Sequence, residues 1–265
     1  AKALAALPGV TVLRGDLADP GTFRDSALEG VRAVFVGCAN SKEQVQLEKN
    51  LIDAASASAT CEYLVKLGTC GVENYTSEDS PIEYGRMHSQ IEAHLSASSM
   101  KWTVLRPNYF MQNHMGDIFG TLPKNLVVYP MAPSATARVV DTRDIGDVAA
   151  ALLRLDDATP HHGQFYDVCG PESVSTQDMA ALYSKSTGRD VVAIQVPPED
   201  WAKAAEEAGF PEWLAAAVAT GMETYWGAGK MDYPSSDAVL QLCPPQRTMS
   251  QWISEHIALS PPPAP

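Results

Sequence analysis

The sequence lacks the features that mark secreted, zinc-binding and membrane proteins. Its five cysteines are odd in number, scattered and never in a CxxC spacing, which favours reduced thiols over a disulfide framework or a zinc site. No run approaches the roughly 18 consecutive apolar residues of a membrane span. The N-terminus has no basic segment followed by an apolar core, so no signal peptide is indicated. We therefore predict a cytoplasmic protein, with the nucleus left open as a second location, that has no metal site and no membrane association.

Positive charge is also scarce. The 265 residues contain 19 Lys and Arg against 32 Asp and Glu, for a formal net charge of −13. With no basic cluster to offset it, this charge repels phosphate backbones, so we predict no direct contact with nucleic acid. The adjacent His161 and His162 have no carboxylate or cysteine at ligand spacing and do not indicate a metal. A hydrophobic share of 45% indicates a folded globular chain.

Short apolar runs alternate with segments of helical periodicity. The alternation occurs five times, which predicts an α/β fold with a doubly wound parallel sheet. The predicted strands of this sheet are 10–14, 31–36, 63–67, 102–105 and 164–168, and shorter strands are expected at 126–129, 137–140 and 191–196. The predicted helices are 1–7, 20–29, 45–55, 81–95, 141–155, 176–187, 199–225 and 250–259, with Asp19 and either Asp141 or Thr142 as N-caps.

The second half mixes helices with single strands, as expected for a lobe that covers one end of a sheet. We predict a core over residues 1–172, with an insertion at about 108–138, and a small, mostly helical C-terminal substrate lobe over 173–260. The proline-rich residues 261–265 are expected to form a disordered tail.

The segment from Lys101 to Met115 predicts where a ligand binds. It reads KWTVLRPNYFMQNHM, an apolar β-branched run that stops at Pro107 and continues into an aromatic, amide-rich loop. The residue before a proline is kept out of helical conformation, so Arg106 stays extended and the loop begins at the carboxyl end of the strand. Ligands of open α/β sheets bind at that end, so we predict a binding crevice there.

Four motifs together resemble those of the NmrA-like family of atypical short-chain dehydrogenase/reductases. They are Arg14-Gly15-Asp16-Leu17, the segment from Leu105 to Asn113, the segment from Val140 to Ile145, and Gly170-Pro171-Glu172. The likeness extends from about residue 1 to about residue 225. It implies a Rossmann-like fold, an NAD(P) cofactor with NADP favoured over NAD, and either reduction of small organic molecules or non-catalytic sensing of the dinucleotide.

The family's opening strand, GxxGxxG turn, helix and second strand are not found in the sequence. The segment Gly68-Thr69-Cys70-Gly71 has one glycine too few, and Gly227-Ala228-Gly229 follows a helix instead of a strand. In the strand order 3-2-1-4-5-6 the missing strands are central, so strands 10–14 and 31–36 lose neighbours. We expect an N-terminally incomplete sheet. Either the sequence is an incomplete form of an ordinary member, or the protein has diverged and no longer binds the dinucleotide in the standard way.

The resemblance assigns cofactor-binding residues to the strand ends. It places Asp16 beside the adenine amino group, although a turn or capping aspartate is equally expected. Gly37, Cys38 and Ala39 are small enough for the backbone to approach a cofactor, and Cys38 is expected to be a small buried residue instead of a nucleophile. Lys66, two residues before Gly68, either reaches the crevice or extends to water at the sheet edge.

Dehydrogenases of this superfamily use a serine or threonine and a Tyr-x-x-x-Lys pair. Here Thr69 would supply the hydroxyl, and Tyr84 and His88 stand at the positions of the pair. A histidine with a pKa near 6.5 is only partly cationic at neutral pH. We therefore predict that His88 is a proton donor or a ligand of the ribose, with an ordinary surface histidine as the alternative.

The loop after the fourth strand completes the predicted site. In family members the positions of Pro107, Asn108 and Tyr109 contact the nicotinamide end of the cofactor and the substrate. The next residues are predicted to line an apolar substrate pocket: Phe110, Met111, Asn113 and His114. For Phe110 and Met111 the alternative is a core position between sheet and lobe.

Three functional hypotheses follow. The first is an NAD(P)H-dependent oxidoreductase that passes hydride to a small apolar molecule such as a quinone, enone or imine. The second is a non-catalytic regulator that senses NAD(P) and binds a protein partner. The third is a truncated form that does not bind the cofactor.

Overall fold

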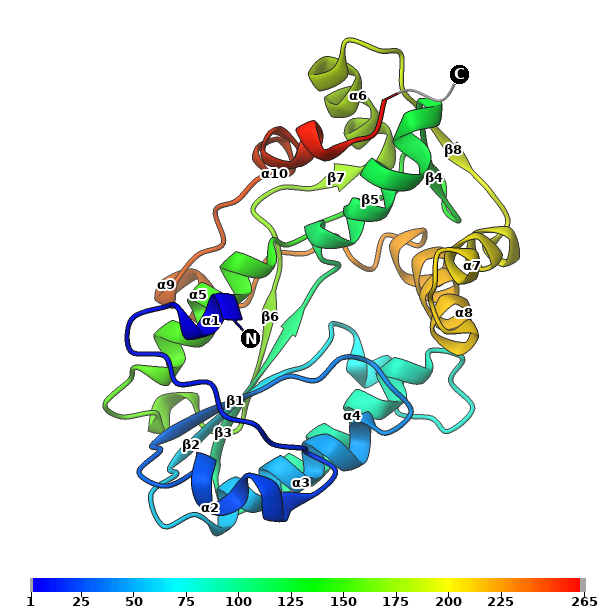
Figure 1. Ribbon diagram of the computed structural model, residues 1–265. Coiled ribbons are helices and arrows are strands. Elements are labelled where there is room, and N and C mark those ends of the chain that lie inside the picture. The colour runs from blue at the N-terminus through cyan, green and yellow to red at the C-terminus, as the bar shows by residue number, and fades with distance from the viewer. Residues whose placement is uncertain (1, 263–265) are drawn as a thin grey trace.

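A four-stranded parallel sheet forms the core of the molecule. The structure is a computed structural model that describes residues 2–262. The sheet has the order β1 (Ala33–Val36), β2 (Tyr63–Leu67), β3 (Lys101–Pro107) and β6 (Gln164–Val168), as Figure 1 shows. Each of these strands lies within its predicted segment or extends it by one or two residues. The α/β fold with a parallel sheet is therefore confirmed.

Helices cover both faces of this sheet. In β2, Leu64 points toward α3 (Gln44–Ala57) and α4 (Glu83–Ser96), where it packs with Ile52 and Ile91. Its neighbours in β2 point the other way, toward α5 (Thr142–Leu153) and α9 (Asp237–Leu242), and Val65 packs with Val148. A strand that is apolar on both faces requires this double cover, which explains the continuous apolar run in the sequence.

Side-chain caps fix where two of the helices begin. Asp141 is the N-cap of α5, since its carboxylate accepts hydrogen bonds from the Arg143 backbone amide at 2.8 Å and from its guanidinium at 2.7 Å. Ser175 and Asp178 form a capping box at the start of α6 (Thr176–Thr187), which ends at Gly188 with a φ of 69°. The predicted boundaries of both helices follow from these residue types.

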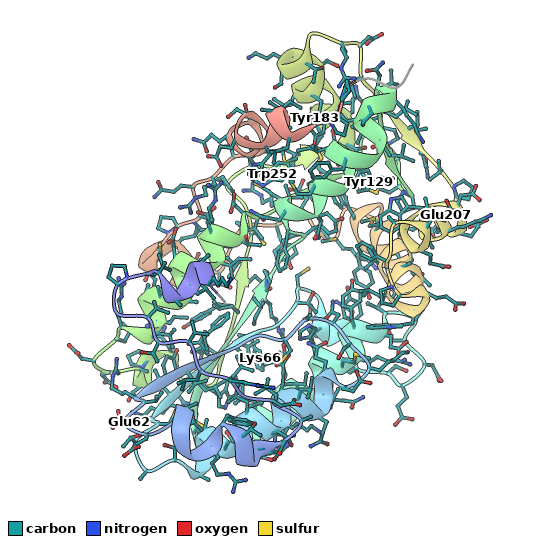
Figure 2. All side chains as sticks on the ribbon, viewed as in Figure 1. Glu62, Lys66, Tyr129, Tyr183, Glu207 and Trp252 are labelled. Atoms are coloured by element: carbon teal, nitrogen blue, oxygen red, sulfur yellow. The ribbon has the colours of Figure 1, made fainter. Side chains whose placement is uncertain are left out.

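The C-terminal half forms a lobe with its own apolar core. Strand β4 (Leu126–Tyr129) pairs in parallel with β8 (Val192–Gln195), and β5 (Thr136–Ala137) pairs antiparallel with β7 (Val174–Ser175). These elements and α6 pack with α10 (Met249–His256). Figure 2 shows Tyr129, Tyr183 and Trp252 gathered there, and each is 3% exposed or less. The segment 126–137 packs with these elements.

The remaining elements are short. Helices α7 (Pro198–Glu207) and α8 (Glu212–Gly221) pack on each other, and α8 also contacts α4. Helices α1 (Lys2–Ala5) and α2 (Arg24–Ala27) lie near the N-terminus. Single turns of 3₁₀-helix occupy 20–22, 72–74, 111–114, 122–124, 159–161 and 257–259, and π-helical turns occupy 117–121 and 222–226. Within residues 2–262, no helix is both long and apolar enough to cross a membrane.

Three predicted elements need correction. Residues 10–14 form no strand, and Val10, Val12 and Leu13 are 42–53% exposed, because no partner strand lies beside them in the described chain. The predicted strand 31–36 shortens to β1, a sheet edge whose Phe35 is 40% exposed. The predicted strand 137–140 is reduced to β5, since Val140 instead forms an isolated bridge with Phe110. Residue 1 of the first helix and residues 263–265 of the proline tail lie outside the described residues.

Candidate functional site

The carboxyl ends of the four parallel strands meet at one edge of the sheet. Gly37 follows β1, Gly68 follows β2, and Asn108 follows β3. Backbone hydrogen bonds extend the pairing past the strand ends, from Cys70 N to Pro107 O at 3.1 Å and from Asn108 N to Val168 O at 3.0 Å. Residues 68–70 and 107–108 are therefore held rigidly side by side at this edge, where ligands of such sheets bind.

Asn108 anchors a later segment of the chain over the same edge. Its side chain is 2% exposed, and its Nδ2 donates to Met231 O at 2.8 Å and to Cys169 Sγ at 3.7 Å. Its Oδ1 accepts from Tyr109 N at 2.7 Å. Ser235 Oγ continues the connection by accepting from Cys169 N at 2.8 Å. The amide of Asn108 is thus fully engaged within the protein.

A buried ionic cluster lies under the β1–β2 side of this edge. Lys66 Nζ stands 2.6 Å from Glu48 Oε2, and both side chains are 0% exposed. The same ammonium donates to Leu67 O at 2.8 Å and approaches His88 Nδ1 at 3.2 Å. Gln44 Nε2 donates to the other oxygen of Glu48 at 2.9 Å. Glu48 lies on α3, Lys66 on β2 and His88 on α4, so the cluster connects these two helices to the sheet.

The position of Lys66 follows from the pleat of β2. Leu64 and Lys66 share the face that packs on α3 and α4, so the ammonium is carried inward and cannot extend to water at the sheet edge. That alternative for Lys66 is therefore wrong. Burying an unpaired ammonium is prohibitively costly. Sequence reasoning missed its counter-ion, although Gln44 and Glu48 stand four residues apart and share one face of α3, a spacing that signals a polar stripe.

His88 is an interior histidine instead of a surface one. It is 6% exposed, and burial together with the Lys66 ammonium holds its pKa well below the usual value. The surface alternative is therefore wrong. Among the described residues the Nε2 atom of His88 has no hydrogen-bond partner. This atom is also not completely shielded from solvent. His88 is thus a neutral imidazole with one nitrogen held by the cluster.

The other two predicted catalytic residues lie in the same region. Tyr84, one turn before His88 on α4, packs edge-on against Tyr75 with ring centroids 6.4 Å apart. Burial, with Cys70 and Tyr225 as its ionisable neighbours, raises the pKa of Tyr84, which opposes ionisation. Thr69 is half-buried directly after β2. Burial also raises the pKa of the neighbouring Cys70 thiol to about 12, so this cysteine is not a ready nucleophile.

A second ion pair, which the sequence did not reveal, borders the cluster. Arg106 of β3 donates to Glu92 Oε2 of α4 at 2.7 Å and stacks over Phe165 at 4.1 Å. Burial raises the pKa of Glu92, although Arg106 opposes the shift. A Cβ at Gly68 would lie 2.9 Å from Glu92 Oε1 and from Val104 Cγ1 and 3.2 Å from Leu105 O, so packing within the protein favours glycine at this position.

The loop after β3 divides its residues between the site and the lobe. Pro107 is buried at the strand end, and Phe110 is half-buried against the core that contains α5. Met111 and His114 are 0% exposed inside the lobe, where His114 Nδ1 lies 2.8 Å from Asp117 Oδ2 and 2.7 Å from the Tyr129 hydroxyl. Tyr109 packs on His114 with ring centroids 5.6 Å apart, and Asn113 is exposed. The two fully buried members need a rearrangement of the lobe before they can touch a substrate.

The residues predicted to hold the dinucleotide are only partly brought together. Gly37 and Ala39 are exposed after β1, and Cys38 is half-buried near Lys66 and Glu48. Asp16 lies in an exposed turn, where its Oδ1 accepts from Ala18 N at 2.9 Å. In the described chain no glycine-rich turn joins a strand of the sheet to a helix. The described residues therefore do not provide a glycine-rich cradle for the phosphates of a dinucleotide.

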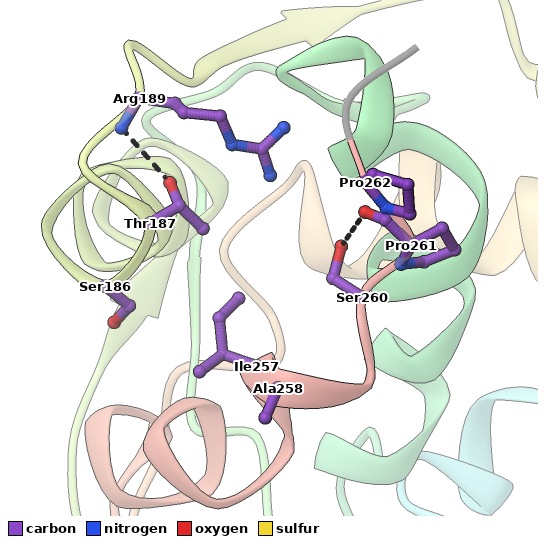
Figure 3. A pocket seen from close by; sticks show the side chains of 8 residues that line it. All are labelled: Ser186, Thr187, Arg189, Ile257, Ala258, Ser260, Pro261 and Pro262. Carbon is purple, nitrogen blue, oxygen red and sulfur yellow. Dashed lines mark hydrogen bonds between the residues drawn. The ribbon is translucent and has the colours of Figure 1, made fainter.

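Two hollows on the surface lie elsewhere. One, of about 410 Å³, is bounded by the end of α6 and by Ile257 to Pro262 (Figure 3). The other, of about 460 Å³, lies between α2 and the end of α3. Neither is lined by a predicted site residue. No group of three or more histidine, cysteine or acidic side chains suited to a metal ion occurs among residues 2–262.

Comparison with known proteins identifies related chains. The model of the NmrA-like family matches residues 1–253. An NAD(P)H azoreductase from Xenophilus azovorans is 30% identical over 255 residues, which cover 94% of this chain and 84% of the relative. A (4-alkanoyl-5-oxo-2,5-dihydrofuran-3-yl)methyl phosphate reductase from Streptomyces griseus is 31% identical over 251 residues, covering 94% and 83%.

The fold also has a close counterpart among solved structures. The NADPH-dependent quinone oxidoreductase of Escherichia coli, solved with NADPH, superimposes with a TM-score of 0.80. The likeness covers 96% of this chain and 86% of that one, at 22% sequence identity. At this identity the similarity establishes the shared fold.

Proposed function

The chain belongs to the NmrA-like family, and from this premise we propose that it is an NAD(P)H-dependent reductase of small apolar molecules such as quinones, enones or imines. Two relatives of at least 30% identity, an azoreductase and a furanone phosphate reductase, support a reductase over a regulator. The solved relative that binds NADPH supports NADPH as the cofactor. The observation that carries the proposal is His88, a buried neutral imidazole at the sheet's carboxyl edge with Nε2 free of protein partners.

The proposal gives each residue of the edge a role. NAD(P)H supplies the hydride when it is bound. His88 presents a hydrogen-bond donor to the substrate or to the ribose, and the Thr69 hydroxyl lies on the adjacent strand end. We assign contact with the ribose to the backbone of Gly37 to Ala39 and of Gly68, and an apolar wall to the half-buried Phe110. Burial raises the pKa of Tyr84 and keeps its proton in place, so in this proposal Tyr84 is a hydrogen-bond donor and not a base.

A binding titration followed by a turnover assay tests this function. The purified chain is titrated with NADPH and NADP⁺ by fluorescence, and NADPH oxidation is then followed with a quinone and with an azo dye. We expect binding and turnover with at least one acceptor, and slower turnover with nearly unchanged binding in His88→Ala. Absence of binding at millimolar cofactor would rule out the reductase. Binding without turnover on any acceptor class would favour the sensing regulator with a protein partner.

The remaining assignments form part of the same proposal. We infer a core over residues 1–172 with an insertion at about 108–138, and a substrate lobe over 173–260. This division is supported by the apolar cluster that combines segments 111–139 and 174–253. We also infer a cytoplasmic location, since all five cysteines are free thiols and suit a reducing compartment. Limited proteolysis tests the first assignment, and fractionation of the producing cell tests the second.

A further inference from the structure

We propose that Lys66 is a positioning residue: its contact with His88 Nδ1 fixes the imidazole in the tautomer that carries its proton on Nε2. The inference rests on the proposed role of His88 and adds which residue determines the tautomer of its ring. It assigns a function to the buried pair of Lys66 and Glu48, which the cofactor and substrate assignments leave unexplained.

The chemistry of the two side chains allows one direction of hydrogen bonding. An ammonium has three donors and no lone pair, so Lys66 can only donate. Its three neighbours are the carboxylate of Glu48 at 2.6 Å, Leu67 O at 2.8 Å and His88 Nδ1 at 3.2 Å. A nitrogen that receives this donor cannot also carry a proton. The proton of the neutral ring therefore resides on Nε2, which then presents an N–H donor.

The surroundings keep both partners in place. Glu48 is held by Gln44 Nε2 at 2.9 Å and is 0% exposed, so the negative charge that retains Lys66 cannot move to water. The fixed ammonium beside Nδ1 and the burial of the ring both disfavour a second proton on His88. His88 therefore acts as a neutral hydrogen-bond donor over the physiological pH range, instead of as an imidazolium acid.

Other ionisable groups face this contact. Cys38 follows β1 and interacts electrostatically with Glu48 and Lys66. Burial raises the pKa of its thiol. On α4 itself, Tyr84 and Glu92 lie one turn to either side of His88, and Glu92 is paired with Arg106. Among residues 2–262, only the ammonium of Lys66 forms a hydrogen bond with the ring. The tautomer is accordingly set by Lys66.

Nitrogen-15 NMR of the imidazole rings tests the inference on the full chain without cofactor. The His88 signals are assigned by their loss in His88→Gln. We expect a neutral ring protonated on Nε2 from about pH 6 to about pH 8. A ring protonated on Nδ1, or one that titrates near pH 6.5, would overturn the proposal.

The matched variant is Lys66→Met combined with Glu48→Gln, which removes both charges together. Glu48→Gln keeps the length of the side chain and an oxygen that can accept from Gln44 Nε2. We expect mixed tautomers and a His88 pKa that rises toward about 6.5. We also expect kcat to fall about 10- to 100-fold, as when partners that orient functional histidines are removed, with KM for NADPH changed by less than about twofold. Unchanged tautomer populations in this variant would refute the role of Lys66.

The two experiments separate this inference from the proposed function. If the wild-type chain binds no NADPH, the reductase proposal and the catalytic role of this contact fail together, whatever the tautomer. If NADPH is oxidised but His88 is protonated on Nδ1, the reductase stands and the positioning role of Lys66 is refuted. Lys42→Met removes an exposed ammonium paired at the same 2.6 Å, and we expect it to leave the His88 tautomer and turnover unchanged.

Discussion

Removing Lys66 alone should destabilise the protein more than most single substitutions do. In Lys66→Met the carboxylate of Glu48, 0% exposed, loses a partner at 2.6 Å and keeps only the hydrogen bond from Gln44. Breaking a buried ion pair from one side costs about 3–5 kcal/mol, because the remaining charge is left without compensation. We expect a decrease of that size in the free energy of unfolding, measured by urea titration at pH 7.

Two comparisons decide whether burial of the ion pair causes the loss of stability: the double variant Lys66→Met/Glu48→Gln and a variant of an exposed ion pair. The double variant removes both charges, so we expect it to recover at least about 2 kcal/mol relative to the sum of the two single losses. Lys42→Met breaks a contact with Glu83 of the same 2.6 Å length, but Lys42 is 53% exposed. Surface pairs contribute about 0–1 kcal/mol, and Lys42→Met should cost no more than that. Additive losses from Lys66 and Glu48, or equal losses from Lys66 and Lys42, would refute the reasoning.

Three further predictions use the same urea titration. Burial and the adjacent ammonium lower the pKa of His88. The contribution of the neutral ring to stability is therefore present above about pH 6.5 and is lost as pH falls, by up to about 1.4 kcal/mol per pH unit. His88→Asn should flatten this dependence of stability on pH, and an unchanged slope would contradict the assignment. Burial tends to raise the pKa of Asp141, but hydrogen bonds from Arg143 outweigh it and the net shift is downward. Asp141→Asn should therefore cost about 1 kcal/mol at pH 7, and the difference from wild type should begin to shrink at about pH 4 and be lost as pH falls further through the lowered pKa of Asp141. A difference that does not change with pH would exclude the ion pair. A Cβ at Gly170 would overlap a backbone carbonyl, so Gly170→Ala should cost about 2 kcal/mol or more, whereas Gly146→Ala in α5, where a Cβ meets no atom within 4 Å, should gain up to about 1 kcal/mol. Equal effects at the two glycines would show that close packing is not the cause.

Local patterns in the sequence were sufficient for most elements of the fold. The runs that became β2 and β3 are buried on both faces over most of their length, and such strands are recognisable without knowing their partners. The cap at Asp141 and the stop at Gly188 depend on residues within a few positions of each other. Residues 10–14 have the same local pattern and are not a strand, because pairing depends on a neighbour that no local pattern contains.

For the site as well, local sequence patterns predict one part and the tertiary structure determines the other. The sequence by itself determined that the chain is a parallel α/β protein of the NmrA-like family, and it indicated that functional residues lie after β2 and β3. Only the tertiary structure decided that Lys66, an apparent edge residue, is buried against Glu48 and His88. The physical reason is that Lys66 meets Glu48, 18 residues before it, and His88, 22 residues after it, only when α3 and α4 pack on the sheet. The charge state and tautomer of His88 follow from that assembly, since an isolated histidine has neither fixed.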